Sequence, residues 1–476
     1  MIFNSFQFLW LFPIIFIVYY ICNSIVGNKK QSKLSNYLLL IISYLLYLQW
    51  NPACTLVLLG VTLCTYFGAI FIEEKERQKK RIIAFITLIL GTFPLIFFKY
   101  YNFISSSINE GFAYLGIEIG LNGINLAIPL GLSFYTFQAI GYVSDVYSKK
   151  VKAERNLPDY MLFIAFFPQI FSGPISKASS LLPQIKANRN FDYSQAVQGL
   201  KWLLWGFFMK VFVADRLGLY VDTVYSNYEY YSGGTCFFAS LFYSLQIYCD
   251  FAGYSLMAIG VGSLLGFNLI NNFNRPYFAQ SVTEFWHRWH ISLSIWLRDY
   301  IYIPLGGSRC SKLRSYLNIL ATFLVSGIWH GANLTFIVWG GIHGLLQIAE
   351  KFLGLHKRNS RGIIKAFRIL LTFLIIDIVW IFFRMPTISS AIDVCRKIFT
   401  DFGGELYKPT NTNFVLMLLG VTMILLKEFF DEYFPKRLRL FDNKSIIVRY
   451  TSYLIILSLI LLFGVFDSTQ FIYVSF

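Results

Sequence analysis

The feature that most constrains this chain is a succession of long apolar segments separated by short polar stretches. The first covers residues 6–26 and is followed by Lys29, Lys30 and Lys33. Further apolar segments lie at 35–50, 53–72, 82–98, 124–143, 199–220, 234–249, 252–270, 316–338, 339–355, 366–384, 413–427 and 450–467. A helix needs roughly 20 apolar residues to cross a bilayer. The pattern therefore predicts an all-α polytopic membrane protein.

The composition excludes several other classes of protein. Apolar residues make up 56% of the chain and charged residues only 14%, whereas a soluble domain carries roughly 25% charged residues. Intrinsic disorder requires low hydrophobicity and is excluded. The seven cysteines show no paired spacing, so neither a disulfide framework nor a metal cage is expected. No low-complexity linker divides the chain, and we expect one integral domain over residues 1–476.

The charges indicate how the chain is oriented. The formal net charge is +16, which in a soluble protein would suggest nucleic acid. In a membrane protein, basic residues gather in cytoplasmic loops and face anionic lipids, so we expect membrane lipids and no nucleic acid as partners. Basic residues follow the first segment and recur at 73–81 and 149–155. The only charged residues in 101–122 are the acidic Glu110 and Glu118. This alternation predicts an N-terminus outside the cell.

Two regions, 158–175 and 276–306, are too polar or too often interrupted by proline to be simple spans. The first contains Ser172-Gly173-Pro174, and the second contains Pro304. Non-helical backbone at membrane depth persists only where protein or a water-filled cavity surrounds it. We therefore expect both regions to be re-entrant or interfacial pieces that line a cavity.

Four of the five histidines fall between residues 287 and 343, together with other ionisable side chains. Ionisable residues at membrane depth are costly and are candidates for function by default. The members of this group that we select as candidates are His287, His290, His330, His343, Arg298 and Asp299.

Residues 281–298 have the pattern of one amphipathic helix. Ser281 followed by Glu284 fits a capping box and predicts the start of the helix. On that helix His287 and His290 share a face, which permits joint metal binding. Two ligands do not close a zinc site, so no metal is expected, and pairing with carboxylates or backbone carbonyls is the alternative.

His330 lies between Gly327 and Gly331 in an otherwise apolar stretch. A single histidine on an apolar face is often a satisfied core residue. An imidazole beside small residues is also suited to act as a general base, and composition leaves both readings open. His343 follows 13 residues later, about 20 Å along an unbroken helix, so we expect it at another level of the fold.

Two carboxylates, Asp250 and Asp377, lie within apolar segments. Asp377 is seven residues before Arg384, on the same helical face, and we expect the two to pair. For Asp250, structural and functional roles both remain open.

Longer strings carry a resemblance to a known family. Residues 284–307, EFWHRWHISLSIWLRDYIYIPLGG, and residues 327–344, GIWHGANLTFIVWGGIHG, resemble the membrane-bound O-acyltransferases. The resemblance is to their bacterial branch, which contains alginate and peptidoglycan O-acetyltransferases. Supporting strings extend it over about 125–385 in the same order.

The resemblance implies a ring of roughly 11–12 transmembrane or re-entrant helices around a central tunnel. It assigns the family's catalytic histidine to His330 and its second near-invariant histidine to His290, with His343 at a further histidine position. The chain departs from the branch pattern near Asp250, where Ala252 and Leu256 replace an expected serine and aspartate. A role for Asp250 in the reaction is therefore weakened.

The implied reaction is acyl transfer, expected to be acetyl transfer, to a hydroxyl group. His330 would take the hydroxyl proton, and His290 would orient the donor or stabilise the oxyanion. The donor would be a cytoplasmic thioester such as acetyl-CoA or an acyl carrier, and no bound cofactor is expected. Lys177 and Lys186 suit its phosphates, or they are simply solvated loop charges.

The acceptor implied by the resemblance is an extracytoplasmic polysaccharide, either an alginate-like exopolysaccharide or peptidoglycan. The enzyme would lie in a bacterial inner membrane. It would transfer the acyl group directly or through a periplasmic or extracellular SGNH-type partner protein. The alternative from another class is a transporter or channel that uses the histidine-lined cavity for permeation.

Overall fold

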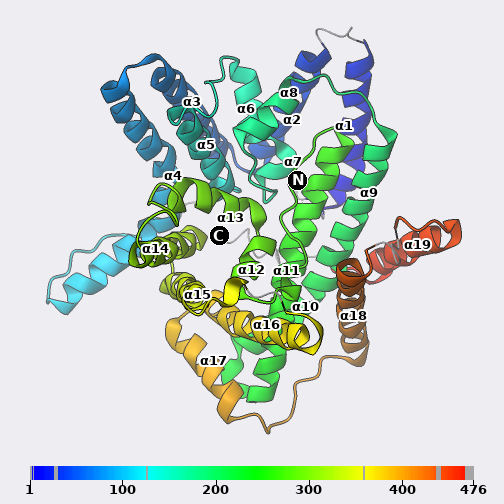
Figure 1. Cartoon of the computed structure of the whole chain (residues 1–476). Helices are drawn as coiled ribbons and strands as arrows, with labels where there is room; N and C mark the ends of the chain where they lie inside the picture. The colour runs from blue at the N-terminus through cyan, green and yellow to red at the C-terminus, as the bar shows by residue number, and fades with distance from the viewer. Residues whose placement is uncertain are drawn as a thin grey trace. The chain divides into compact units, whose positions relative to one another are not determined.

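The computed structural model describes residues 3, 5–25, 31–124, 127–357, 360–435 and 441–466, and the regular elements there are all helices (Figure 1). Contacts divide the chain into two compact units. Of the described residues, the first unit comprises those up to Gly199 together with Val261–Ile270, and the second comprises Leu200–Gly260 and those from Asn271 onward. The predicted all-α class is confirmed, and the single integral domain stays a prediction. Lys29, Lys30 and the start of the segment 124–143 lie outside the described residues.

Eight helices in the described part of the chain are long and apolar enough to cross a bilayer. Helices satisfy every backbone hydrogen bond internally, which is why apolar segments of this length fold as helices in lipid. These candidate spans are Gln7–Ser24, Pro52–Glu74, Arg77–Tyr114, Tyr193–Ser226, Gly233–Leu264, Gly362–Arg384, Asn411–Tyr433 and Ile446–Phe463.

The first unit is built from the N-terminal helices. They are α1 (Phe6–Ile25), α2 (Gln31–Trp50), α3 (Pro52–Glu74), α4 (Arg77–Tyr114), α5 (Leu132–Tyr147), α6 (Leu157–Ala165), α7 (Phe167–Ile170) and α8 (Ala178–Lys186). The side chain of Asn51 accepts from the N–H of Cys54 and so caps α3. The helix α9 (Tyr193–Phe207) and the helix α11 (Gly233–Leu264) each have residues in both units.

The predicted re-entrant region 158–175 is helical in two short pieces that break at Phe166. Polar side chains bind the backbone and one another beside this break. The N–H of Phe167 donates to Ser43 Oγ at 3.2 Å, and Gln169 Nε2 donates to Gln138 Oε1 at 2.8 Å. Interrupted backbone is tolerated in lipid where protein groups satisfy it, and that is what these buried polar side chains do.

The second unit contains the remaining elements. They are the π-helix η1 (Phe208–Ala214), α10 (Asp215–Ser226), η2 (Tyr228–Tyr230), η3 (Pro276–Phe278), α12 (Val282–Arg288), α13 (Ile291–Leu297), η4 (Arg298–Tyr302), α14 (Lys312–His330), α15 (Leu334–Phe352), η5 (Leu355–Lys357), α16 (Gly362–Arg384), α17 (Ile388–Thr400), α18 (Asn411–Tyr433) and α19 (Ile446–Phe463).

The region 281–298 is not the single helix that its pattern predicts. Ser281 caps α12 as expected, because its Oγ accepts from the N–H of Glu284 at 3.0 Å. The helix then ends at Arg288, and α13 begins at Ile291. His290 between them has a left-handed backbone with φ of 41°, a conformation that helical periodicity cannot reveal.

The helices α14 and α15 form a tight hairpin in place of the two spans predicted at 316–338 and 339–355. The chain turns at 331–333, and Asn333 caps α15 by accepting from the N–H of Thr335 at 3.0 Å. A Cβ on Gly327 would overlap the carbonyl oxygen of Phe336, so the two backbones approach closely at this glycine.

Candidate active site

The α14–α15 hairpin brings His330 and His343 to the same aromatic side chain. The ring centroid of Trp339 lies 5.0 Å from that of His330 and 4.9 Å from that of His343. The expectation that His343 serves another level of the fold is therefore wrong. It assumed an unbroken helix, whereas the chain reverses after His330 and returns along α15.

His330 is the last residue of α14 and is 3% exposed. Its ring contacts Trp329 at 4.8 Å and Phe383 at 5.0 Å between centroids. The C-terminal end of a helix favours positive charge. His330 therefore stands where the helix dipole is negative.

His290 lies between α12 and α13, outside the eight candidate spans, and is 1% exposed. A left-handed backbone costs a non-glycine residue about 1–3 kcal/mol. Asn272 holds the turn, since its carbonyl oxygen accepts from the N–H of Ile291 at 2.9 Å and its Oδ1 from the N–H of Ser292 at 3.1 Å. Burial lowers the pKa of His290 to about 3, so its ring is neutral at physiological pH.

His343 is fully buried and has a defined hydrogen-bond partner. The Nε1–H of Trp286 donates to Nδ1 of His343 at 3.3 Å. In a neutral imidazole one nitrogen accepts and the other carries the proton. This bond therefore assigns the proton of His343 to Nε2.

The three buried histidines and two tryptophans form one row of rings, which we call the histidine cluster. Trp329 lies between His290 and His330, with centroids 6.0 Å from the first and 4.8 Å from the second. Trp339 continues the row from His330 to His343. The structure thus brings together three candidates from α14, α15 and the turn before α13.

A cavity of about 510 Å³ lies beside this cluster, in the same unit. Trp286 belongs to its wall and also contacts His343. Its basic lining side chains, within the described part of the chain, are His287, Arg298, Lys351 and His356. Apolar and hydroxyl side chains complete the wall: Thr283, Ile291, Ser294, Ile295, Leu297, Tyr302, Ile319, Thr322, Phe323 and Ser326, with Gln347. A cavity of this lining suits a ligand with an anionic end and an aliphatic arm.

His287, Arg298 and Asp299 lie apart from the histidine cluster. His287 lines the cavity and is exposed, and because α12 ends before His290, the two do not share the helical face predicted for them. Arg298 also lines the cavity and pairs with Asp299 at 2.7 Å. Within the described ranges no group of three His, Cys, Asp or Glu residues is placed to hold a metal ion.

Asp250 belongs to a buried ion triad. The ammonium group of Lys210, on η1, lies 2.7 Å from Asp250 and 2.6 Å from Asp215. All three side chains are at most 1% exposed. Burying a charge is costly unless it is paired, and these pairings support the structural reading of Asp250.

Asp377 does not pair with Arg384 as predicted. Its carboxylate accepts from Ser240 Oγ at 2.7 Å and from Ser244 Oγ at 2.6 Å. Arg384 pairs with Asp222 at 2.7 Å. Partners on other helices, which periodicity cannot show, satisfy both groups.

Lys177 and Lys186 belong to the first unit, whereas the histidine cluster belongs to the second. Lys177 immediately precedes α8 and is half-buried. Lys186 ends the same helix and pairs with Glu154 at 2.6 Å. A carboxylate partner lowers the attraction of Lys186 for a phosphate group.

The sequence reading missed Lys351 and Gln347, which line the cavity from α15. Both follow His343 at intervals of four residues, and so share its helical face. That spacing was visible in the sequence, and it places an amide and an ammonium group in line with a candidate histidine.

Comparison with known proteins supplies the class of enzyme. A family model described as MBOAT, membrane-bound O-acyltransferase family, matches residues 3–385. The chain therefore belongs to the membrane-bound O-acyltransferase family. It is a multi-pass membrane O-acyltransferase, as the resemblance implied.

Individual relatives show which proteins of the family are similar to this chain. The chain is 39% identical over 400 residues to the probable alginate O-acetylase AlgI of Pseudomonas syringae pv. tomato, which covers 82% of this chain and 74% of that protein. It is 34% identical over 425 residues to the peptidoglycan O-acetyltransferase of Helicobacter pylori, covering 83% and 79%. A teichoic acid D-alanyltransferase of Bacillus subtilis is 28% identical over 246 residues, covering 48% and 60%. These relatives favour the enzyme over a transporter or channel.

Proposed function

We propose that this chain transfers an acetyl group from a cytoplasmic thioester to hydroxyl groups of an extracytoplasmic polysaccharide. The observation that carries the proposal is the row of three buried histidines beside a cavity with basic lining. The names of the relatives, which refer to alginate, peptidoglycan and teichoic acid, indicate the class of acceptor.

In the proposed reaction His330 is the general base. Its imidazole accepts the proton of an acceptor hydroxyl while the oxygen attacks the thioester carbonyl carbon. The tetrahedral intermediate then collapses, the C–S bond breaks, and the thiolate leaves with the proton from the imidazolium. His290 orients the donor or stabilises the oxyanion, and His343 supports the cluster through Trp339.

The cavity is the proposed binding place for the donor. Arg298 and Lys351 offer positive charge, and His287 and His356 offer imidazole N–H groups, to the phosphate groups of acetyl-CoA or of an acyl carrier's phosphopantetheine arm. The apolar and hydroxyl wall suits the aliphatic amide part of such an arm. Asp299 positions Arg298. Lys177 and Lys186, in the first unit, are a separate proposal for side chains that bind phosphate groups.

The proposed setting is the inner membrane of a bacterium, with the N-terminus outside and one integral domain. The acyl group would enter from the cytoplasm and leave on the outer side. It would reach the polysaccharide directly or through a periplasmic or extracellular SGNH-type partner protein.

Replacement of His330 tests the proposal. The variants His330→Ala and His330→Gln are expected to abolish base-labile acetate on the cell's polysaccharide. His330→Gln keeps a polar side chain of similar size. Both variants should be inserted in the membrane at normal levels. Asp431→Asn, at a surface ion pair on α18, is the control and should retain acetylation. Normal acetylation in the histidine variants, or altered solute uptake with intact acetylation on deletion, would overturn the proposal.

A further inference from the structure

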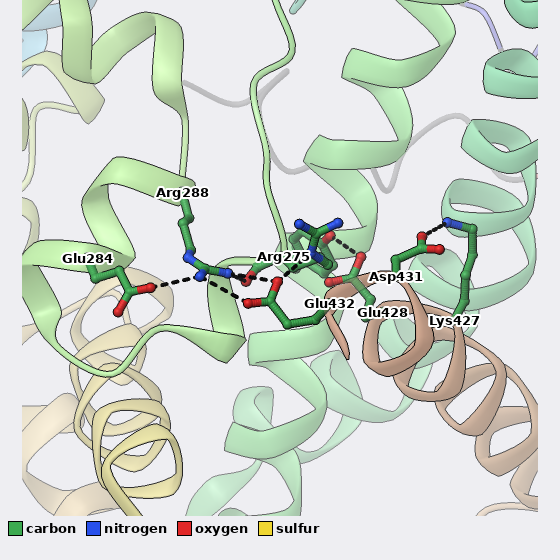
Figure 2. A network of polar contacts seen from close by, with 8 residues as sticks. Arg275, Glu284, Arg288, Lys427, Glu428, Asp431 and Glu432 are labelled. Carbon is green, nitrogen blue, oxygen red and sulfur yellow. Dashed lines mark hydrogen bonds and ion pairs between the residues drawn. The ribbon is translucent and has the colours of Figure 1, made fainter. Parts of the chain in front are cut away.

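Two arginines, Arg275 and Arg288, converge on one carboxylate of α18 (Figure 2). Glu432 accepts from Arg275 Nε at 2.7 Å and from both terminal nitrogens of Arg288 at 3.1 Å. Arg288 also pairs with Glu284 at 2.7 Å. Bidentate arginine–carboxylate hydrogen bonds fix the relative geometry of the two groups as well as stabilising the pair. The Glu432 side chain is also only 11% exposed to solvent.

The two arginines come from the backbone segments that enclose His290. The N–H of Asn274 donates to the carbonyl oxygen of Arg288 at 2.9 Å, so the two segments are bonded side by side. Arg275, like His290, has a left-handed backbone, with φ of 47°. Strained conformations of this kind persist only where the surrounding structure holds them. Glu432 binds the side chains of both segments and is placed to do so.

The opposite end of α12 has its own carboxylate. Glu350 of α15 accepts from the backbone N–H groups of Val282 and Thr283 at 2.7 and 2.9 Å. The helix is therefore anchored at its first turn by Glu350 and at its last by Glu432. Trp286, which donates to the histidine cluster, lies between these two anchors.

We propose that Glu432 is a positioning residue for acyl transfer. Through Arg275 and Arg288 it fixes the left-handed turn at His290 and holds α12, with Trp286, against the histidine cluster. Helix α18 begins at Asn411, beyond residue 385 where the match to the family model ends. A segment outside the matched region thus becomes part of the site. The expected effect of Glu432 on the rate of acyl transfer rests on the proposed function. Its expected effect on the turn at His290 and on α12 does not.

The structural consequence is tested by hydrogen exchange on the full chain in detergent. Glu432→Gln keeps the shape of the side chain and removes its charge. It is expected to speed amide exchange in residues 282–297 about tenfold, because the turn loses its anchor. Asp431→Asn, one residue away in the half-exposed pair with Lys427 (Figure 2), is the matched control and should leave this segment unchanged. Should Glu432→Gln fail to fold, Glu432→Asp, which keeps the charge on a shorter stem, is expected to show intermediate exchange.

The kinetic consequence is tested with labelled acetyl-CoA in membrane vesicles. Glu432→Gln should lower kcat about tenfold and leave KM for acetyl-CoA within about twofold. The reason is that the turn at His290 is proposed to affect the chemical step and not the binding of the donor. Combined with Arg288→Gln, the change Glu432→Gln should cost less than the sum of the two single effects, because both changes remove the Arg288–Glu432 contact.

Three results would overturn the proposal: exchange in Glu432→Gln equal to that in Asp431→Asn, fully additive effects in the double variant, or equal loss of kcat in the control. If wild-type vesicles transfer no label from acetyl-CoA, the proposal that acetyl-CoA is the donor is wrong. The exchange comparison still decides the role of Glu432 in that case.

Discussion

At the scale of single residues, the site depends on indoles as much as on imidazoles. Trp286 sets the tautomer of His343, and Trp339 and Trp329 space the three histidines. Aromatic side chains are rigid and apolar, so they can hold imidazoles in place without competing for the proton.

Trp286→Phe should lower kcat for acetyl transfer about tenfold, equivalent to about 1.4 kcal/mol, because Nδ1 of His343 loses its donor and the tautomer is no longer defined. Initial rates in vesicles, corrected for protein amount, measure this. Trp289→Phe removes a similar ring volume from the same segment without touching His343, and it should have the smaller effect. Equal loss in both variants would contradict the assigned hydrogen bond.

The buried His290 predicts a pH dependence of stability. Its pKa is lowered to about 3 by burial, whereas the unfolded value is about 6.5. Between these values the unfolded chain binds a proton that the folded chain does not. The free energy of unfolding therefore falls by about 1.4 kcal/mol for each pH unit below 6.5 from this group. Thermal unfolding from pH 7 to pH 5 should show a shallower decline in His290→Gln, and parallel curves would refute the assignment.

At the scale of elements, the α14–α15 hairpin decides which histidines meet. Close backbone contact at Gly327 and Gly340 brings the two helices together. The sequence predicted one apolar span over 316–338, with His330 inside it, and a second over 339–355. Apolar residues continue on both sides of residues 331–333, so apolar patterning does not show that the chain reverses there, and the separation it predicts for His330 and His343 is too long.

Gly327→Ala should destabilise the protein, because the added methyl group overlaps the carbonyl oxygen of Phe336. Overpacking of this kind costs about 1–3 kcal/mol. Gly341→Ala on the facing helix is a matched control, since its Cβ would meet only Leu324 Cδ2 at an ordinary 3.7 Å. A lower Tm in detergent for the first variant alone is the expected outcome, and equal Tm values would show that the hairpin can separate at no cost.

At the scale of the whole chain, charge is used sparingly and in two ways. Lys149 and Lys150 lie exposed in a loop after α5, whereas Lys210 is fully buried with Asp215 and Asp250. Lys210→Met leaves two carboxylates without their shared cation and should cost about 3–5 kcal/mol. The control Lys427→Met disrupts a half-exposed pair and should cost about 0–1 kcal/mol. Protein yield and Tm in detergent measure both, and a mild effect of Lys210→Met would mean that the triad is not stabilising.

The class of fold and the family could be predicted from the sequence, because apolar length and long motif strings are local features. The roles of the three histidines stay a prediction. Sequence reading did not recover the break in the helix at His290, since a left-handed residue leaves no periodic signal. Nor could it find Glu432, which lies 144 residues from Arg288 along the chain. Contacts at that separation depend on tertiary structure.

The turn at 331–333 also limits how the gene for such an enzyme can change. One residue added there would rotate the whole of α15 by about 100° about its axis, because a helix has 3.6 residues per turn. His343 and the face it shares with Lys351 would then point away from His330. Substitutions can accumulate in this loop as its neighbours permit, but its length behaves as a fixed spacer, and insertions or deletions there should be rare among working copies.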